Sequence, residues 1–378
     1  MQNKSWWLEF RRKMPVVEKW AYFDHAAVAP LSGPALQTLS AWSCEAASNG
    51  EVNWSAWRKR VEEVRDLAAK FVGADSTEIA LIHNTTEGIT LVAEGFPWKP
   101  GDNVVTPVGE FPTNLYPWLN LASRGIEVRQ VPTVDERVDL KMLESACDER
   151  TRIVTISWVG FATGWRNDVD ALAEIAHRRG AYLFLDAIQG LGVFPLDVRK
   201  TPVDFLAVDG HKWLLGPEGA GIFFVRRDNL ELLQPMGVGW NSVQNEWDFS
   251  HPQFNLKPSA ARFEGGSYNM AGLHALGASL EMLYGYGVEM LSERVQELTD
   301  SICERLRGIG ANIVSVREDN RLSGIVAVEV PRKDPNVVRK MCRCRGVIVN
   351  CRAGRLRVSP HAYNNDEDID RLIAAIAI

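Results

Sequence analysis

Between about residues 60 and 225 the sequence alternates short apolar runs with amphipathic segments of helical spacing, and this alternation restricts the fold strongly. Helical patterns cover residues 60–71, 88–95 and 169–179. The apolar runs are nearly continuous and cover residues 78–83, 103–107, 152–157, 181–185 and 205–208. Short strands of this kind are typical of a parallel sheet that helices cover on both faces. The sequence therefore predicts an α/β fold with a large, doubly wound, mainly parallel sheet.

The pattern changes after about residue 255. A long helical stretch covers residues 270–307 and is interrupted near Gly285 and Gly287. Shorter segments follow, with strand patterns at 325–330, 347–350 and 355–359 and helical patterns at 336–344 and 366–376. A chain of 378 residues is long enough for two domains. We predict a large α/β domain over residues 20–255 and a smaller α+β domain formed by residues 1–19 and 256–378.

The charge balance and the cysteine pattern argue against several classes of protein. Lys plus Arg total 42 and Asp plus Glu total 48, so a formal net charge of -6 disfavours binding of nucleic acid. The one short basic cluster, 339–345, is interpreted as a solvated helix face. No run approaches the ~20 apolar residues of a membrane span, and residues 1–19 lack the apolar core of a signal peptide. The six cysteines form no Cys-x-x-Cys pair, so we expect no metal and a reduced, cytoplasmic protein.

Polar motifs follow several of the predicted strands, at the edge of the sheet where α/β proteins bind ligands. After the strand at 78–83, Asn84 and Glu87 fit a capping box that opens the next helix. The free amides of that helix start, together with the hydroxyls of Thr85 and Thr86, form a seat suited to a phosphate. A simple helix cap is the alternative interpretation.

Two ionisable residues follow two later predicted strands. Asp186 follows the apolar run 181–185, where a buried carboxylate is costly without a cationic partner such as a protonated pyridine nitrogen. Its alternative role is a helix cap or an ion pair. Lys212 follows the run 205–208, and a desolvated lysine in a cleft can attack an aldehyde. Gly210 and Gly216 would let the backbone approach a ligand. A lone exposed lysine is the alternative, but together the strand-end motifs indicate a pyridoxal-phosphate site with Lys212 as the Schiff-base lysine.

Several of these segments are similar to motifs of one protein family. The chain resembles the class V aminotransferases, fold-type I pyridoxal-phosphate enzymes that include cysteine desulfurases, kynureninases and isopenicillin N epimerase-like proteins. The resemblance extends over nearly the whole chain. Its segments are Tyr22 to Ala27, Thr85 to Gly88, Asp186 to Gln189, Gly210 to Lys212, Arg262 to Ser267 and Arg357 to Ser359.

The resemblance implies a role for each matching residue. Lys212 holds the cofactor and moves protons at the substrate carbon, while Asp186 pairs with the ring nitrogen. Arg357 binds the substrate carboxylate, work suited to its fork of donors. The remaining roles are phosphate binding by Thr85, Thr86 and His211, ring stacking by Phe111, contact with the ring hydroxyl by Gln189, and lining of the substrate site by His25 and Ala27. Ser267 would reach the phosphate of a neighbouring subunit, which implies a homodimer with active sites at the interface. For His25, a hydrogen-bonded structural histidine is the alternative.

The chain departs from the family pattern at a few positions. Many desulfurases have histidine where this chain has Phe111. The desulfurase nucleophile is a cysteine on a loop before the carboxylate-binding arginine, whereas here Cys351 to Arg357 is a compact stretch. We therefore interpret Cys351 as the end of a strand and not as a persulfide carrier. Phe161 stands where other branches have an asparagine near the ring hydroxyl. Asp209 stands where many relatives have a phosphate-binding serine, so we expect it to turn away or to pair with His211.

These departures leave the reaction open. Because the desulfurase cysteine loop is missing, the sequence favours transamination between an amino acid and an oxo acid. The alternatives are a C–S or C–C β-lyase, to which the kynureninase-like segments 111–116 and 159–164 point, an amino-acid epimerase, and a non-catalytic cofactor-binding module. The intact set of Lys212, Asp186 and Arg357 argues against the last, since a pure binder needs no carboxylate clamp. The side chain of the substrate is not predicted.

Overall fold

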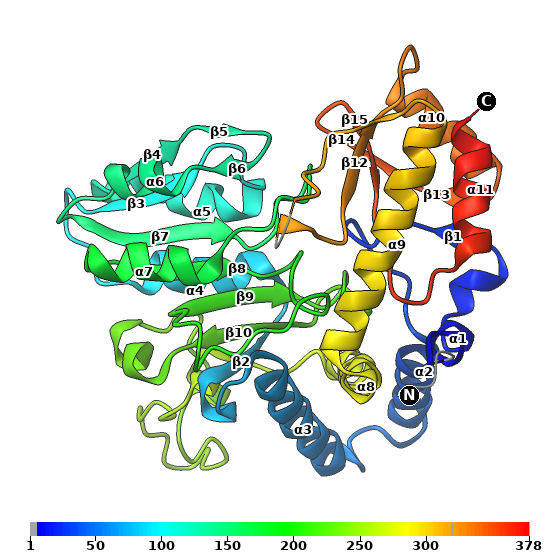
Figure 1. Cartoon of the computed structure of the whole chain (residues 1–378). Coiled ribbons are helices and arrows are strands. Elements are labelled where there is room, and N and C mark those ends of the chain that lie inside the picture. Colours follow the sequence, from blue (N-terminus) through cyan, green and yellow to red (C-terminus); the bar gives the residue numbers. More distant parts are fainter. Residues whose placement is uncertain (1–5, 319–320, 378) are drawn as a thin grey trace.

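The computed structural model describes residues 6–318 and 321–377 and places a large sheet beside a smaller one (Figure 1). The large sheet is parallel except for one strand, β10, which is antiparallel to both of its neighbours. Its strands, in spatial order, are β2 (Ile79–Ile82), β10 (Gly221–Val225), β9 (Phe205–Asp209), β8 (Tyr182–Asp186), β7 (Thr151–Ser157), β3 (Asn103–Pro107) and β4 (Glu127–Val131). The predicted α/β, mainly parallel architecture is confirmed.

Both faces of this sheet are buried. In β8, Leu183 and Leu185 belong to one hydrophobic core, whereas Phe184 between them belongs to another on the opposite face. Successive side chains of a strand point to opposite faces, so an apolar run of this kind needs a cover on each side. The main covering helices are α3 (Trp54–Val72), α4 (Thr85–Gly95), α7 (Val169–Arg178) and α8 (Met270–Tyr286).

The smaller sheet is antiparallel, in the order β11 (Asn312–Ile313), β12 (Val326–Glu329), β15 (Arg355–Val358) and β14 (Asn350–Arg352). It shares a third core with residues of α9 (Val288–Gly308), α10 (Pro335–Cys344) and α11 (Asp366–Ile376). Near the N-terminus, β1 (Ala21–Tyr22) pairs in parallel with β13 (Val347–Ile348), and Ala21 and Phe23 join this core. Helix α8 instead contributes Leu276 to the core of the large sheet. The exact domain division stays a prediction.

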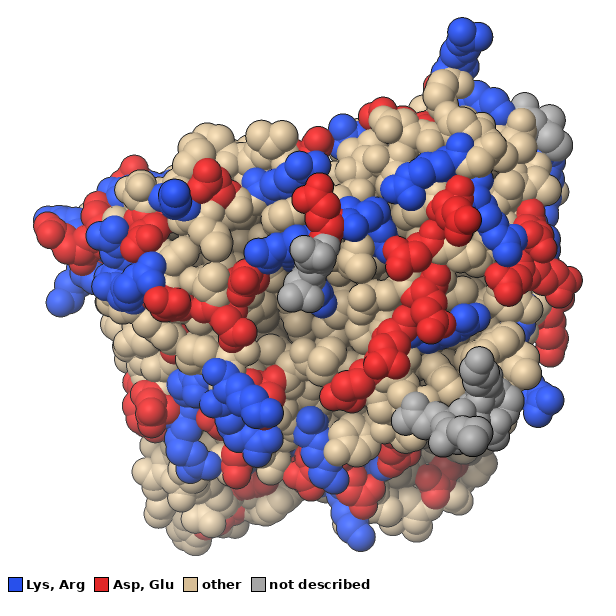
Figure 2. All heavy atoms as spheres, viewed as in Figure 1, with Lys and Arg blue, Asp and Glu red and all other residues tan. Residues whose placement is uncertain are grey.

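The remaining helices and strands are short or peripheral. They are α1 (Trp6–Arg12), α2 (Gly33–Asn49), α5 (Tyr116–Leu119), α6 (Leu140–Ala146) and the hairpin of β5 (Thr133–Val134) and β6 (Arg137–Val138). Acidic side chains gather along α9 on the face shown in Figure 2, while the basic residues Arg339, Lys340 and Arg343 of α10 are exposed, as expected of a solvated helix face. Among the described helices, none has the length and apolarity that a bilayer crossing requires.

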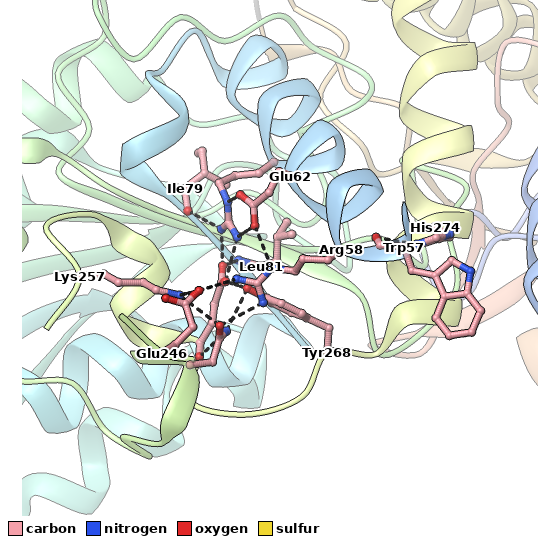
Figure 3. A network of polar contacts seen from close by, with 12 residues as sticks. Trp57, Arg58, Glu62, Ile79, Leu81, Glu246, Lys257, Tyr268 and His274 are labelled. Atoms are coloured by element: carbon pink, nitrogen blue, oxygen red, sulfur yellow. Dashed lines mark hydrogen bonds and ion pairs between the residues drawn. The ribbon is translucent and has the colours of Figure 1, made fainter. Parts of the chain in front are cut away.

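A buried ion pair joins α3 to the segment that precedes α8. The Arg65 guanidinium contacts the Glu264 carboxylate, with Nη2 2.9 Å from Oε2. The same carboxylate accepts hydrogen bonds from the Leu81 amide and the Tyr268 hydroxyl, each at 2.6 Å (Figure 3). Because Arg65 belongs to α3 and Leu81 to β2, Glu264 fixes the backbone just before Ser267 against these two elements.

Candidate active site

A cavity of about 260 Å³ opens at the carboxyl ends of the parallel strands, between the two sheets. It is lined by most of the residues that the sequence singled out: Ala27, Thr85, Thr86, Phe111, Asp186, Gln189, His211, Lys212 and Arg357. Two predicted residues, His25 and Ser267, are not among its lining residues. Residues that lie more than 300 positions apart in the sequence, such as Ala27 and Arg357, meet here because β15 packs beside the N-terminal segment.

Lys212 follows β9 and is buried beside the cavity. Burial lowers the pKa of Lys212 to about 8, and the neighbouring Asp186 carboxylate partly opposes this shift. Its Nζ lies 5.7 Å from the centre of the Phe111 ring. Gly210 is needed for this turn, since a Cβ there would lie 2.7 Å from the Ala220 carbonyl oxygen. Lys212 is therefore held on a tight turn with a side chain that loses its proton easily.

Asp186 is the last residue of β8 and is 2% exposed. One of its carboxylate oxygens accepts a hydrogen bond from the Ile188 amide at 3.0 Å. Burial raises the pKa of Asp186 to about 6. A buried carboxylate that faces a cavity is stabilised by a cationic ligand atom.

The start of α4 forms one wall of the cavity. Asn84 caps the helix by accepting a hydrogen bond from the Glu87 amide at 3.0 Å. The capping box is only half as predicted, because the Glu87 carboxylate accepts from the His83 amide and not from that of Asn84. Among the described residues, the buried Thr85 hydroxyl has no hydrogen-bond partner, and Thr86 contacts Thr113 at 3.1 Å. Free amides and an unpaired hydroxyl at a helix start suit an anion.

Asp209 and His211 lie on the same wall. The His211 Nδ1 is 2.9 Å from the Asp209 Oδ2, so the carboxylate pairs with His211, one of the two arrangements expected from the sequence. This contact lacks the geometry of a hydrogen bond, and the other oxygen of Asp209 has no partner among the described residues. The Asp209 carboxylate thus lies against the His211 ring at this wall of the cavity.

The residues present fit pyridoxal phosphate. The helix start with the unpaired Thr85 hydroxyl suits its phosphate, Asp186 suits its ring nitrogen, and Lys212 suits its aldehyde. Phe111 forms an edge-to-face contact with Phe161, with ring centres 5.3 Å apart, at the side of the cavity. These assignments of single residues stay predictions.

Arg357, on β15, is 1% exposed and has its two terminal nitrogens engaged. Nη1 donates to the Phe161 carbonyl at 2.7 Å, and Nη2 donates to Asp24 Oδ1 at 3.3 Å. The buried Nε has no partner among the described residues. Burial raises the pKa of Asp24 and lowers that of Arg357, although their mutual attraction opposes both shifts. Arg357 is therefore a preoriented cation with an unused donor.

The loop that carries Phe161 is held by a hairpin that sequence patterns did not reveal. The Glu136 carboxylate accepts hydrogen bonds from the Ala162 amide at 2.9 Å and the Thr163 amide at 2.6 Å. Asp135, next to it, forms an ion pair with Arg355 at 2.9 Å. Both Asp135 and Glu136 have positive φ angles, so the hairpin tolerates strained backbone to reach these partners. It thus connects the Phe161 loop to β15, the strand of Arg357.

The side chains of Gln189 and His25 form more hydrogen bonds within the protein than their predicted roles as ligands imply. The Gln189 amide oxygen accepts from Trp213 Nε1 and its Nε2 donates to the Ala26 carbonyl, both at 2.9 Å, which leaves one N–H for a ligand. His25 is fully buried, with Nδ1 2.9 Å from the Ser359 carbonyl oxygen and Nε2 2.8 Å from the Tyr363 hydroxyl. The structure thus favours the structural alternative for His25.

Ser267 lines separate surface hollows, one of them with Trp240 and Trp247.

No cysteine of the described chain lines the cavity. Cys351 lies on β14, where its Sγ is 3.1 Å from the Pro335 carbonyl oxygen. Burial raises the pKa of the Cys351 thiol, which is the opposite of what a reactive thiolate needs. Arg352 and Thr113 also line the cavity, although neither was predicted as a ligand. The pairing of β14 with β15 brings Arg352 there.

Comparisons with known proteins agree with this geometry. The family model described as aminotransferase class-V matches residues 21–372. A probable cysteine desulfurase of Methanothermobacter thermautotrophicus is 32% identical over 388 residues, which cover 96% of each chain. The apo structure of a cysteine desulfurase from Thermococcus onnurineus NA1 is 26% identical, with a TM-score of 0.89 over 97% of this chain and 96% of that one. A C-DES mutant with glycine linked to its pyridoxal-phosphate cofactor shares the fold at 21% identity, with a TM-score of 0.92 over 97% and 98% of the two chains.

Proposed function

The chain belongs to the class V aminotransferase family of pyridoxal-phosphate enzymes, and on this premise we propose that it is a carbon–sulfur lyase acting on a cysteine-type amino acid. The relatives named cysteine desulfurase support cleavage of a C–S bond. They favour the lyase alternative over the transamination that the sequence favoured, which no comparison confirms.

One observation determines the kind of cleavage that we propose. The cavity contains Lys212, Asp186 and Arg357, but no cysteine of the described chain lines it. A protein thiol that accepts sulfur therefore has no candidate at the site, and the sulfur must leave with its own substituent. We assign the reaction as β-elimination: the Cβ–S bond breaks, its electron pair leaves with the sulfur, and water converts the remaining enamine to pyruvate and ammonia. The step consumes no oxidant or reductant.

Each of the cavity residues has a separate role in this reaction. Bound pyridoxal phosphate supplies an electron sink for the substrate α-carbon. Arg357 lines the cavity as the cation for the α-carboxylate, and its contacts with Asp24 and the Phe161 carbonyl hold its guanidinium in place. Lys212, whose pKa is lowered to about 8 by burial, is suited to removing the α-proton near neutral pH. Phe111 and Phe161 form an apolar side of the cavity.

The test is a product analysis with cysteine and cystine as substrates of the purified holoenzyme. We expect pyruvate and ammonia in equal amounts, with sulfide or persulfide released to solution. Cys351→Ser should give the same products at the same rate, because Cys351 lies outside the cavity. Alanine together with a persulfide on the protein, lost in Cys351→Ser, would instead establish a desulfurase. Release of an oxo acid with conversion of the cofactor to its amine form would establish transamination.

A further inference from the structure

Glu110 immediately precedes Phe111, and its carboxylate reaches the end of the strand next to Asp186. One oxygen accepts a hydrogen bond from the Ser157 amide at 2.7 Å, and the other accepts from the Ser157 hydroxyl at 2.5 Å. Ser157 is buried, ends β7 and is paired with Asp186 of β8, and the Trp158 amide donates to the Asp186 carbonyl at 2.8 Å. Glu110 therefore connects the segment of Phe111 to the strand end that borders Asp186.

No cation balances this carboxylate within the described chain. Glu110 forms no ion pair with a Lys, Arg or His side chain of the described residues, and the Lys212 Nζ lies 5.7 Å from the centre of the neighbouring Phe111 ring. In the small hollow that Glu110 lines, Glu136 is the only other titratable residue. Glu110 is thus a carboxylate with hydrogen-bond donors but without a counterion.

The charge that acts on Glu110 is that of Asp186. Burial is the main cause that raises the pKa of Glu110 to about 7, and Asp186 raises it further, whereas the side chains of Ser157 and Asn114 oppose the shift. The pKa of Asp186 is about 6, so Asp186 loses its proton first and its charge then opposes the ionisation of Glu110. A cation bound beside Asp186 removes this opposition.

We propose that Glu110 is a positioning residue of the ring-nitrogen site, which holds the end of β7 beside Asp186 and supplies a second negative charge that stabilises a protonated pyridine nitrogen. The inference rests on the predicted pairing of Asp186 with the cofactor ring and not on the reaction that follows. Binding of a cationic ring favours the loss of the Glu110 proton to solvent. By linkage, ionised Glu110 strengthens this binding. Its contribution is fully present above the pKa of about 7 of the unliganded protein and is lost as the pH falls below that value.

Two ligands that differ in one ring atom test the second charge without turnover. Pyridoxamine phosphate and its 1-deaza analogue share the phosphate and the amine, but the analogue has a carbon in place of the ring nitrogen. Neither has an aldehyde, so neither forms a Schiff base with Lys212. Equilibrium dialysis against the cofactor-free full-length chain gives the dissociation constants at about pH 5.5 and 8.5.

Glu110→Gln keeps an oxygen that can accept from the Ser157 amide and removes the charge. We expect this variant to bind pyridoxamine phosphate about three- to tenfold more weakly than the wild type at about pH 8.5 and nearly as tightly at about pH 5.5. The 1-deaza analogue should bind equally to both proteins. Equal weakening of both ligands at both pH values would show a purely structural role and would overturn the proposal, as would wild-type binding of both ligands.

Two further variants separate the possible failures. Asp186→Asn should also weaken only pyridoxamine phosphate, and by a larger factor. If Asp186→Asn has this effect and Glu110→Gln does not, the second charge fails and the role of Asp186 stands. If neither has it, the ring-nitrogen site is wrongly assigned and the proposal fails with it. Neither result bears on the lyase function, since no product is measured.

Glu136→Gln is the matched control. Glu136 lines the same small hollow, but its carboxylate accepts from the Ala162 and Thr163 amides and does not contact Ser157. Its effect should therefore be the same for the two ligands. A loss that depends on the ring nitrogen in this variant too would show a general effect of negative charge and would overturn the specific role of Glu110.

Discussion

At the scale of single residues, the burial of Lys212 determines the pH range in which its amine can react with an aldehyde. Only the neutral amine attacks, and burial lowers the pKa of Lys212 to about 8. Asp186 and Asp209 face the ammonium and raise the pKa, whereas Arg357 and Arg352 lower it further. The neutral fraction therefore increases as pH rises through about 8, two pH units or more below an exposed lysine.

This predicts the pH dependence of cofactor capture. When pyridoxal phosphate is added to cofactor-free protein, the rate of Schiff-base formation, followed by stopped-flow absorbance, should reach half of its maximum near pH 8. Asp186→Asn removes an anion that holds the proton on Lys212, so its half-point should move to lower pH. A half-point above pH 10 in the wild type would show that Lys212 behaves as an exposed lysine and would contradict the burial argument.

The same scale shows why some site residues could be predicted and others not. Lys212 and Asp186 each follow a continuous apolar run, so a local pattern places them at the carboxyl edge of the sheet. Arg352 faces the cavity only because β14 pairs with β15, and Glu136 contacts the Phe161 loop from a hairpin more than 20 residues away. Such contacts depend on tertiary packing and leave no periodic signal in the sequence.

At the scale of elements, the long and strongly patterned segments matched their prediction best. The helical stretch at 270–307 is divided into α8 and α9 at Gly287, whose φ is +88°, as the glycine interruption suggested. Strand β10 and helix α2 were not predicted. Helix α2 begins with Gly-Pro and buries little beyond Ala35, so it has no clear amphipathic pattern. β10 is a short, fully buried apolar run, and periodicity alone does not distinguish such a run from a buried helical segment.

The buried ion pair between α3 and Glu264 should be important for stability. Glu264→Gln leaves the buried Arg65 guanidinium with Glu62, a half-exposed carboxylate of the same helix, as its remaining charged partner, and breaking a buried pair typically costs about 3–5 kcal/mol. We expect a loss of this size in the free energy of unfolding measured with urea. Glu281→Gln breaks the more exposed pair with Arg60 and should cost no more than about 1 kcal/mol. Equal losses in the two variants would contradict the role assigned to burial.

At the scale of the whole molecule, Ser267 and an apolar surface near it point to a second subunit. Ser267 lies outside the cavity of its own chain, beside Trp240 and Trp247. Trp247 and Phe249 lie beside each other, with ring centres 6.1 Å apart, and are 52% and 71% exposed, although the segment that carries them has little regular structure. Large exposed aromatic groups that gather on one surface are typical of an interface with another protein. The homodimer implied by the sequence resemblance would cover them.

We predict that the protein is a homodimer whose assembly requires this aromatic surface. Sedimentation velocity at micromolar concentration should give a dimer for the wild type and a monomer for the double variant Trp247→Glu, Phe249→Glu. Val337→Glu, on the exposed face of α10, should remain dimeric. If Ser267 reaches the phosphate of the other subunit, Ser267→Ala should weaken pyridoxal-phosphate affinity while the dimer persists, and the monomeric double variant should bind the cofactor at least as weakly. A wild-type monomer that binds the cofactor fully would show that each chain builds a complete site alone, and Ser267 would then have no role in binding the phosphate.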